Sequence, residues 1–189
     1  MNVNTLFIPL IFLPAIASAT PYLGAEFGAG TIGSSVSTVY AADSGKNYQY
    51  DKSEIFGAFA GYQFDSGRTD SLGIELGYRN YSSDDVVLDG QAQTKMDASQ
   101  FSLKPVYFYN LNKKITLKTS VGLTHTHYKF NAHYDKASET RTYNVYGAIA
   151  SVGADAVVTK NVTIGTSISY QMDEIAHATT FMINSTYRF

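Results

Sequence analysis

The feature that most constrains this chain is the regular alternation of apolar and polar residues that follows residue 20. It falls into eight stretches of roughly ten residues, which polar segments separate. Successive side chains of a β-strand point to opposite faces, so a period of two predicts strands rather than helices. The predicted strands cover residues 22–32, 54–64, 71–81, 97–109, 115–128, 142–158, 162–172 and 178–189.

The connections between these stretches differ in length in a regular way. The first, third, fifth and seventh span 33–53, 82–96, 129–141 and 173–177, whereas the others span only 65–70, 110–114 and 159–161. In a sheet that goes up and down, odd-numbered connections lie at one end and even-numbered ones at the other. Short turns at one end and longer loops at the opposite end are typical of outer-membrane barrels.

The two faces of each strand carry different residues. Between residues 71 and 81, Leu72, Leu76 and Tyr78 share one face, and the opposite face holds glycine together with Glu75 and Arg79. A soluble lipocalin-like barrel is the alternative, but it needs a charged outer face, and only 16% of the residues are charged. The sequence therefore predicts an eight-stranded antiparallel up-and-down transmembrane β-barrel, with apolar residues toward lipid and small residues in a narrow lumen.

The first residues have the pattern of a secretory signal peptide. An apolar run from Leu6 to Ile16 ends in Ala17-Ser18-Ala19, and the run is too short for a membrane-spanning helix. We expect cleavage after Ala19, which divides the chain into a signal peptide (1–19) and a barrel domain (20–189). The expected location is the outer membrane of a Gram-negative cell. A net charge of −2 disfavours nucleic-acid binding, and the absence of cysteine excludes thiolate chemistry.

Three segments carry a family resemblance. Gly57-Ala58-Phe59-Ala60-Gly61-Tyr62-Gln63, Gly73-Ile74-Glu75-Leu76-Gly77-Tyr78 and the final Tyr187-Arg188-Phe189 resemble the transmembrane domain of outer-membrane protein A and the related opacity and adhesion barrels. The resemblance implies a periplasmic amino terminus, meander topology, four surface loops and no separate peptidoglycan-binding domain. It also implies that the last strand carries a signal for the outer-membrane assembly machinery, formed by Phe181, Ile183, Tyr187 and Phe189.

Barrels of this family hold ion pairs in the lumen, and several positions here match. The resemblance places Glu75, Lys104 and Asp155 inside, whereas Ser120 and Ser167 stand where the family prototype has arginine, and Glu26 replaces a lysine. Two residues at equal distance from the middle of a hairpin connection lie opposite each other on adjacent strands. This rule predicts that Glu75 faces Lys104 and that Lys118 lies near Asp155. The candidate lumen charges are therefore Glu26, Glu75, Arg79, Lys104, Lys118 and Asp155.

Groups that could carry chemistry are few. His125 and His127 share a face and, with His133 and Asp135, could hold a metal ion. Asp84, Asp85 and Asp89 could hold Ca²⁺, although solvated loops of this kind are common. No serine stands beside a histidine, and His177 lies near only Thr179 and Glu174. We predict no catalytic residue, no metal and no cofactor.

The predicted function follows from the resemblance. We expect a monomeric, non-enzymatic surface protein in contact with outer-membrane lipid and lipopolysaccharide, with adhesion, envelope integrity or phage reception as the implied roles. Segments 33–53 and 129–141 carry the candidate recognition residues Tyr40, Tyr48, Tyr50 and Tyr134, which would meet a host-cell or matrix ligand. A small gated pore and a lipid-A-modifying or proteolytic enzyme are the alternatives.

Overall fold

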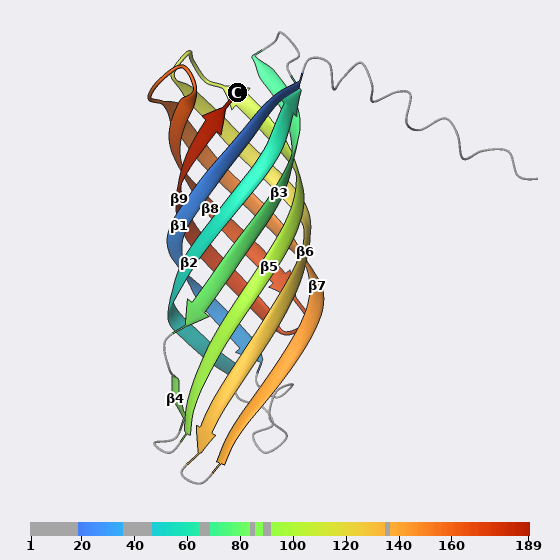
Figure 1. Cartoon of the computed structure of the whole chain (residues 1–189), viewed down its shortest axis with the longest axis vertical. Coiled ribbons are helices and arrows are strands. Elements are labelled where there is room, and N and C mark those ends of the chain that lie inside the picture. Colours follow the sequence, from blue (N-terminus) through green and yellow to red (C-terminus); the bar gives the residue numbers. More distant parts are fainter. Residues whose placement is uncertain (1–18, 36–46, 65–68, 84–85, 89–91, 135–136) are drawn as a thin grey trace, which may run out of the picture.

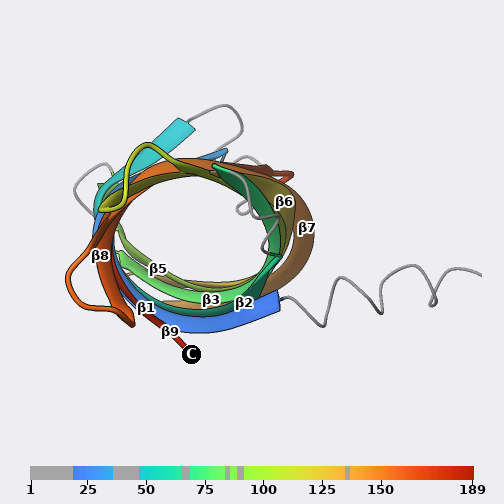
Figure 2. The ribbon, with the colours of Figure 1, turned by 90° about the horizontal axis from the view of Figure 1, so that it is seen from above.

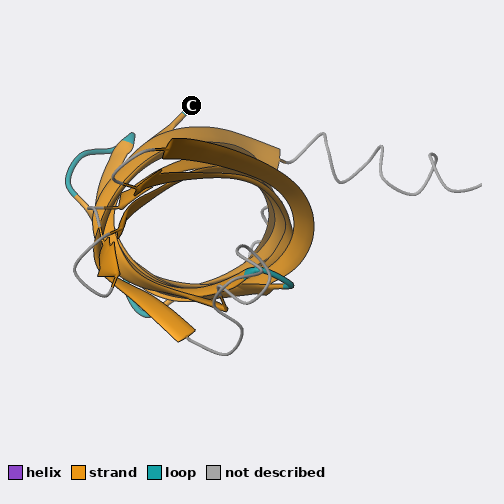
Figure 3. Ribbon diagram, turned by 90° about the horizontal axis from the view of Figure 1, so that it is seen from below, coloured by secondary structure: helices purple, strands orange, loops and turns teal. Residues whose placement is uncertain are grey.

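The computed structural model describes residues 19–35, 47–64, 69–83, 86–88, 92–134 and 137–189. Every element in these ranges is a β-strand, and no helix there is long and apolar enough to cross a membrane (Figure 3). The strands are β1 Ala19–Ser35, β2 Asn47–Phe64, β3 Asp70–Ser83, β4 Val86–Leu88, β5 Ala92–Asn110, β6 Ile115–Tyr134, β7 Ala137–Val157, β8 Val162–Asp173 and β9 Ala176–Arg188.

Eight of these strands close into an antiparallel barrel, which is seen end-on in Figure 2. Consecutive barrel strands pair throughout, and β1 pairs with β9 to complete the ring. The three-residue strand β4 lies between β3 and β5 in sequence and pairs only with β5, while β3 pairs directly with β5. The predicted fold class, an eight-stranded up-and-down barrel, is confirmed, and β4 is an addition that the sequence pattern did not predict.

The strands continue beyond their predicted ends on one side of the barrel. Segments 33–53, 82–96 and 129–141, expected as loops, contain the outer ends of β1, β2, β5, β6 and β7 and the whole of β4. The expected loop 129–141 is mostly a hairpin, because β6 and β7 stay paired from Lys129 with Thr142 to Tyr134 with Ala137. This correction has a physical reason: polar segments can continue a ladder when they need no apolar face toward lipid.

Side-chain burial alternates along each barrel strand. In β9 the buried positions include Thr180, Met182 and Asn184, and the exposed ones between them include Phe181 and Ile183. Large apolar residues on the outer face are strongly exposed, for example Leu123 at 71%. Such exposure is unstable in water but favourable in hydrocarbon, so this face is the lipid-contacting surface.

Short turns at one end are fixed by side chains that cap backbone N–H groups. Asn112 Oδ1 accepts hydrogen bonds from the N–H groups of Lys114 and Ile115 at 2.8 and 2.9 Å, which closes the β5–β6 turn. The start of β1 and the end of β9 lie at this same end (Figure 1), where the Phe189 N–H donates to the Pro21 carbonyl. This is the periplasmic end of a barrel of this type, and the extended strands mark the outer end.

Candidate functional site

An ion pair in the lumen bridges two strands that are not neighbours. Glu26 on β1 and Arg79 on β3 each pair in register with Gly57 on the intervening strand β2. Arg79 Nε donates to Glu26 Oε1 at 2.6 Å, and Nη2 donates to Oε2 at 3.2 Å. A Cβ at Gly57 would stand 2.8 Å from Glu26 Oε1, so the glycine makes room for the bridge.

A second ion pair lies nearer the periplasmic end and joins adjacent strands, and a tyrosine reaches it across a glycine. Glu75 and Lys104 are register partners on β3 and β5, and Lys104 Nζ stands 2.7 Å from Glu75 Oε1. The hydroxyl of Tyr22 on β1 donates to Glu75 Oε2 at 3.1 Å, passing over Gly61. Both side chains of the pair are more than nine-tenths buried, and the second carboxylate oxygen has a donor as well.

Lys118 lies between an acid and two aromatic rings. Its Nζ stands 3.4 Å from Asp155 Oδ2, an ion pair without hydrogen-bond geometry, because neither oxygen of this carboxylate has a hydrogen-bond partner. The same ammonium lies 5.4 Å from the ring centre of Phe59 and 6.0 Å from that of Phe108. These rings and Tyr22 form an apolar cluster with Val106. Aromatic faces attract the cation and fill the lumen at this level.

The polar network in the outer half of the lumen consists mainly of neutral groups. Its carboxylate is that of Asp173, which accepts hydrogen bonds from the Tyr128 hydroxyl at 2.7 Å and from Gln171 Nε2 at 3.2 Å. Gln100 Nε2 donates to Gln171 Oε1 at 2.5 Å and to Thr126 Oγ1 at 3.1 Å, and the hydroxyl of Tyr81 donates to the amide oxygens of both glutamines. Beyond this network, an apolar cluster that includes Met96, Tyr128, Phe130 and Met182 fills the barrel. Side chains therefore close the described lumen at both ends.

The space left between the charged pairs is small. A cavity of about 30 Å³ is bounded by Glu26, Glu75, Arg79, Lys104, Lys118 and Asp155 among others. Such a volume suits one or two water molecules rather than a continuous aqueous path. The lumen in this state is packed like the interior of the smallest barrels.

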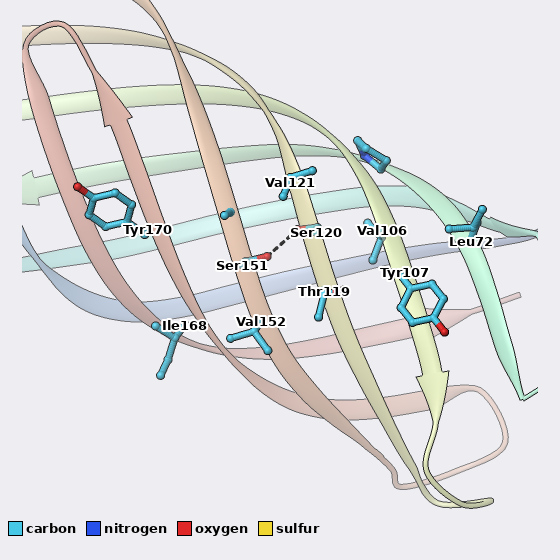
Figure 4. A pocket seen from close by; sticks show the side chains of 12 residues that line it. Leu72, Val106, Tyr107, Thr119, Ser120, Val121, Ser151, Val152, Ile168 and Tyr170 are labelled. Carbon is cyan, nitrogen blue, oxygen red and sulfur yellow. Dashed lines mark hydrogen bonds between the residues drawn. The ribbon is translucent and has the colours of Figure 1, made fainter.

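A larger hollow lies on the outside of the barrel. It has a volume of about 530 Å³ and lies over β5, β6 and β7, where Pro105 interrupts the ladder between Leu103 and Val106 (Figure 4). Behind it, the hydroxyls of Ser120 and Ser151 hydrogen-bond at 2.6 Å (Figure 4). Its walls are mostly apolar side chains such as Ile168 and Val121, so it suits lipid acyl chains.

At the outer end, which is the lower end in Figure 1, the hairpin of β6 and β7 extends beyond β8 and β9. We call this extension, residues 129–134 and 137–146, the raised wall. β7 pairs with β6 from Ala137 onward but with β8 only from Gly147, because β8 ends at Asp173. Within the described residues, nothing pairs with the β8-facing edge of β7 between Ala137 and Tyr146. Thr140, Thr142 and Asn144 are exposed on the outward face of this wall.

The candidate recognition tyrosines lie on or near these extensions. Tyr48 and Tyr50 belong to β2 and Tyr134 ends β6, although the structure does not describe their side chains. Tyr40 lies outside the described residues, as does Ala17 of the predicted cleavage site, while Ala19 begins β1. The proposed assembly residues Phe181, Ile183, Tyr187 and Phe189 all face outward and are 44% to 65% exposed.

The groups weighed for chemistry do not assemble into a site in the described part of the chain. His125 and His127 both face outward, but no group of three metal-ligating side chains occurs among the described residues. Asp84, Asp85, Asp89 and Asp135 lie outside them, and the side chain of His133 is not described. No serine hydroxyl bonds to His125, His127 or His177 there, since the one histidine hydrogen bond joins His127 to Asn144.

Sequence reasoning missed the aromatic filling and the glutamine network. The signal for the first was present, because Phe59 shares a face with Gly57 and Gly61 and pairs in register with Gly24. A ring opposite a glycine can cover it, and a Cβ at Gly24 would collide with Phe59. The pairing of Glu26 with Arg79 was also missed, since it requires the register of three strands together.

A closed meander with an apolar outer face, short turns at one end and a packed polar lumen defines a small outer-membrane β-barrel. The family model described as outer membrane protein beta-barrel domain matches residues 5–189. The chain belongs to this family, and its location is the bacterial outer membrane. No curated protein matches the sequence.

Solved structures of the same shape have very different sequences. Ail, the attachment invasion locus protein of Yersinia pestis, superposes with a TM-score of 0.55 at 16% identity over 90% of this chain and 97% of its own. Neisserial surface protein A gives 0.61 at 11% identity over 90% and 99%. A major outer membrane protein of Thermus thermophilus gives 0.62 at 11% over 91% and 100%. At such identities the likeness concerns the fold alone.

Proposed function

We propose that this protein is a non-enzymatic surface-recognition protein whose raised wall binds a protein ligand in adhesion. The observation that carries the proposal is the β8-facing edge of β7 from Ala137 to Tyr146, with which no described strand pairs. Backbone N–H and C=O groups on a free edge can pair with an extended segment of another chain. The barrel strands anchor this edge in the membrane and hold it at the cell surface.

Polar residues and aromatic support make the wall suitable for recognition. Its outward face presents Thr140, Thr142 and Asn144, while Tyr143 and Val145 on the other face pack against the apolar cluster of the outer lumen. The ring of Phe130 meets that of Tyr143 edge-on at 6.1 Å. A supported edge is pre-organised, so the wall itself loses less conformational entropy when a partner strand binds.

The charge of the outer end favours a protein ligand over a polyanion. One solved structure holds Ail with the heparin analogue sucrose octasulfate. In this chain the outer segments 33–53, 82–96, 129–141 and 173–177 contain six basic and nine acidic residues, a net charge of −3. A surface with this balance repels sulfated polymers at long range.

The alternatives receive less support from the same structure. A pore requires displacement of the ion pairs and of both apolar clusters, because the cavity between the charged pairs has a volume of about 30 Å³. Envelope integrity and phage reception would use the same outer surface, and each predicts that loss of the wall leaves adhesion unchanged. Catalysis has no assembled group in the described part of the chain.

The test shortens the wall beyond Lys129, which also removes Phe130 from the apolar cluster of the outer lumen. Lys129 and Thr142 are cross-strand partners, so an Asn-Gly turn between them replaces 130–141 and leaves a hairpin of ordinary geometry. The matched control places the same turn between Gly33 and Gln49, which are partners on β1 and β2. Heat-modifiable gel mobility confirms that both variants fold.

We expect binding of whole cells to epithelial cells and matrix proteins to be lost in the wall variant and kept in the control. Equal adhesion of both variants and the parent protein would refute the adhesion proposal. Discrete conductance steps in a planar bilayer, or release of fatty acids from lipid A, would favour the pore or the enzyme instead.

A further inference from the structure

Outward-facing rings mark the height of the outer membrane interface. Three cross-strand pairs of rings lie toward the outer end of the apolar belt: Phe27 with Phe56, Tyr78 with Phe101, and His125 with Tyr146, with centroids 5.2, 5.0 and 4.8 Å apart. Aromatic belts of membrane proteins lie at the level of the lipid headgroups. On β6, therefore, His125 gives the position of the interface.

The next two outward residues of β6 are His127 and Lys129, and both are exposed. Two residues of a tilted strand rise about 5 Å along the membrane normal. The polar layer of one leaflet is roughly 5–7 Å thick. His127 thus stands within the headgroup layer, and the backbone of Lys129 lies a few ångströms beyond it, from which its long, flexible side chain can reach back.

Neighbouring side chains orient the imidazole and leave the ammonium accessible. His127 Nδ1 lies 2.8 Å from Asn144 Oδ1, and when Nδ1–H donates to this oxygen, Nε2 is left for another partner. Asp97 is the register partner of Lys129, but its carboxylate stands 3.7 Å from Lys95 Nζ. Among the described side chains, no acid forms an ion pair with Lys129.

At the level of His127, the outward positions compared on four other strands carry no basic side chain. Two residues beyond the girdle rings Phe56, Tyr78, Phe101 and Phe181, the outward positions hold Glu54, Asn80, Ser99 and Thr179. These residues are acidic or uncharged. An anion that approaches the interface is therefore attracted to β6 rather than spread around the barrel.

From this placement we propose that the outward face of β6 binds a phosphate group of an outer-leaflet lipid through His127 and Lys129. Lys129 can donate a charge-assisted hydrogen bond to a phosphate oxygen, and His127 donates from Nε2–H when the ring is the imidazolium, with Nδ1–H on Asn144. The girdle at His125 and Tyr146 contacts the part of the lipid below. The site lies at membrane height, whereas the edge proposed for adhesion lies further out on β7.

The test compares lipids that differ only in phosphate. The full mature chain is folded in detergent with lipid A or with the same lipid A after dephosphorylation, and native mass spectrometry counts the lipid retained. We expect preferential retention of the phosphorylated form. The double variant H127Q/K129Q should weaken this preference about tenfold or more, since hydrogen bonds to charged groups are lost.

The matched control is K113Q/K160Q, which removes two exposed lysines from the opposite end of the barrel. Heat-modifiable mobility checks the folding of each variant. Equal retention of the two lipids by the parent protein, or an unchanged preference in H127Q/K129Q, overturns the proposal. Inorganic phosphate that binds as tightly as the lipid would assign the site to a soluble anion and overturn the lipid assignment.

Discussion

The two halves of the lumen are filled in opposite ways. In the periplasmic half and the middle, acids and bases pair across strands, as Glu26 does with Arg79 and Glu75 with Lys104. In the outer half, here called the neutral half, the network around Gln100 and Gln171 consists mainly of amides and hydroxyls, and the Asp173 carboxylate accepts a hydrogen bond from Gln171. The same strands and the same alternation support both, so the alternation determines which face is inside but not how that inside is held together.

The difference matters when one partner is removed. A buried charge left alone costs several kcal/mol, because its desolvation is no longer offset. A buried neutral group left alone costs about 1–3 kcal/mol. Substitutions in the charged half should therefore be more damaging than equivalent ones in the neutral half, and partner substitutions should repair them.

The largest effect is expected for Arg79→Met. This change leaves the Glu26 carboxylate without its two hydrogen bonds and removes the bond from Arg79 Nη1 to Ser169 Oγ. We expect the free energy of unfolding, measured by urea titration of barrels folded in vesicles, to fall by about 3–5 kcal/mol. Adding Glu26→Gln should recover part of the loss. A loss below that of a typical exposed substitution would show that the bridge contributes nothing.

A smaller loss is expected for Lys104→Met, at about 2–3 kcal/mol. The Glu75 carboxylate keeps the hydrogen bond from the Tyr22 hydroxyl, so it is not left wholly unpaired. Combined with Glu75→Gln, the double variant should be more stable than the sum of the single losses predicts. Strict additivity of the two losses in the same urea titration would mean that the side chains do not interact.

In the neutral half, Gln171→Leu should lower the free energy of unfolding by about 1–3 kcal/mol. Leucine fills similar space but leaves the Gln100 Nε2 donor and the Tyr81 hydroxyl with one acceptor fewer. A loss equal to that of Arg79→Met would remove the distinction between the two halves. The matched exposed control is Thr166→Val on the same strand β8.

The smallest effect is expected on the raised wall. Asn144→Ala removes the hydrogen bond to His127, but both residues are exposed outside the apolar core of the membrane. The free energy of unfolding should change by no more than about 0.5 kcal/mol. A larger loss in the same titration would show that the wall supports the barrel instead of only being carried by it.

Much of this architecture was predictable from local pattern. Eight strands, their faces and their order follow from the alternation, and reflection about a connection places Glu75 opposite Lys104. Contacts that need three strands, such as Glu26 to Arg79 over Gly57, require every intervening register to be known first. Local pattern alone does not supply that chain of registers.

The raised wall was hidden from the sequence for a different reason. The outward residues of this segment, such as Lys129 and Thr140, are polar, so its strands lack the apolar lipid-facing residues that identify a membrane strand. The free edge of β7 depends on β8 being shorter than β7, a relation between two strands that neither one encodes alone. The aromatic cluster around Phe59 depends similarly on glycines of neighbouring strands.

The pairing of β1 with β9 has a consequence for the order of events in folding. Tyr22 and Arg188 are partners although almost the whole described chain separates them, so closure is the most non-local contact of the fold. Until β9 has been made and delivered, β1 presents an open ladder edge with nothing to pair with. Synthesis from the amino terminus therefore yields a chain that must be kept from aggregating until a late step closes the barrel. The rate of that step depends on how β1 and β9 are brought together.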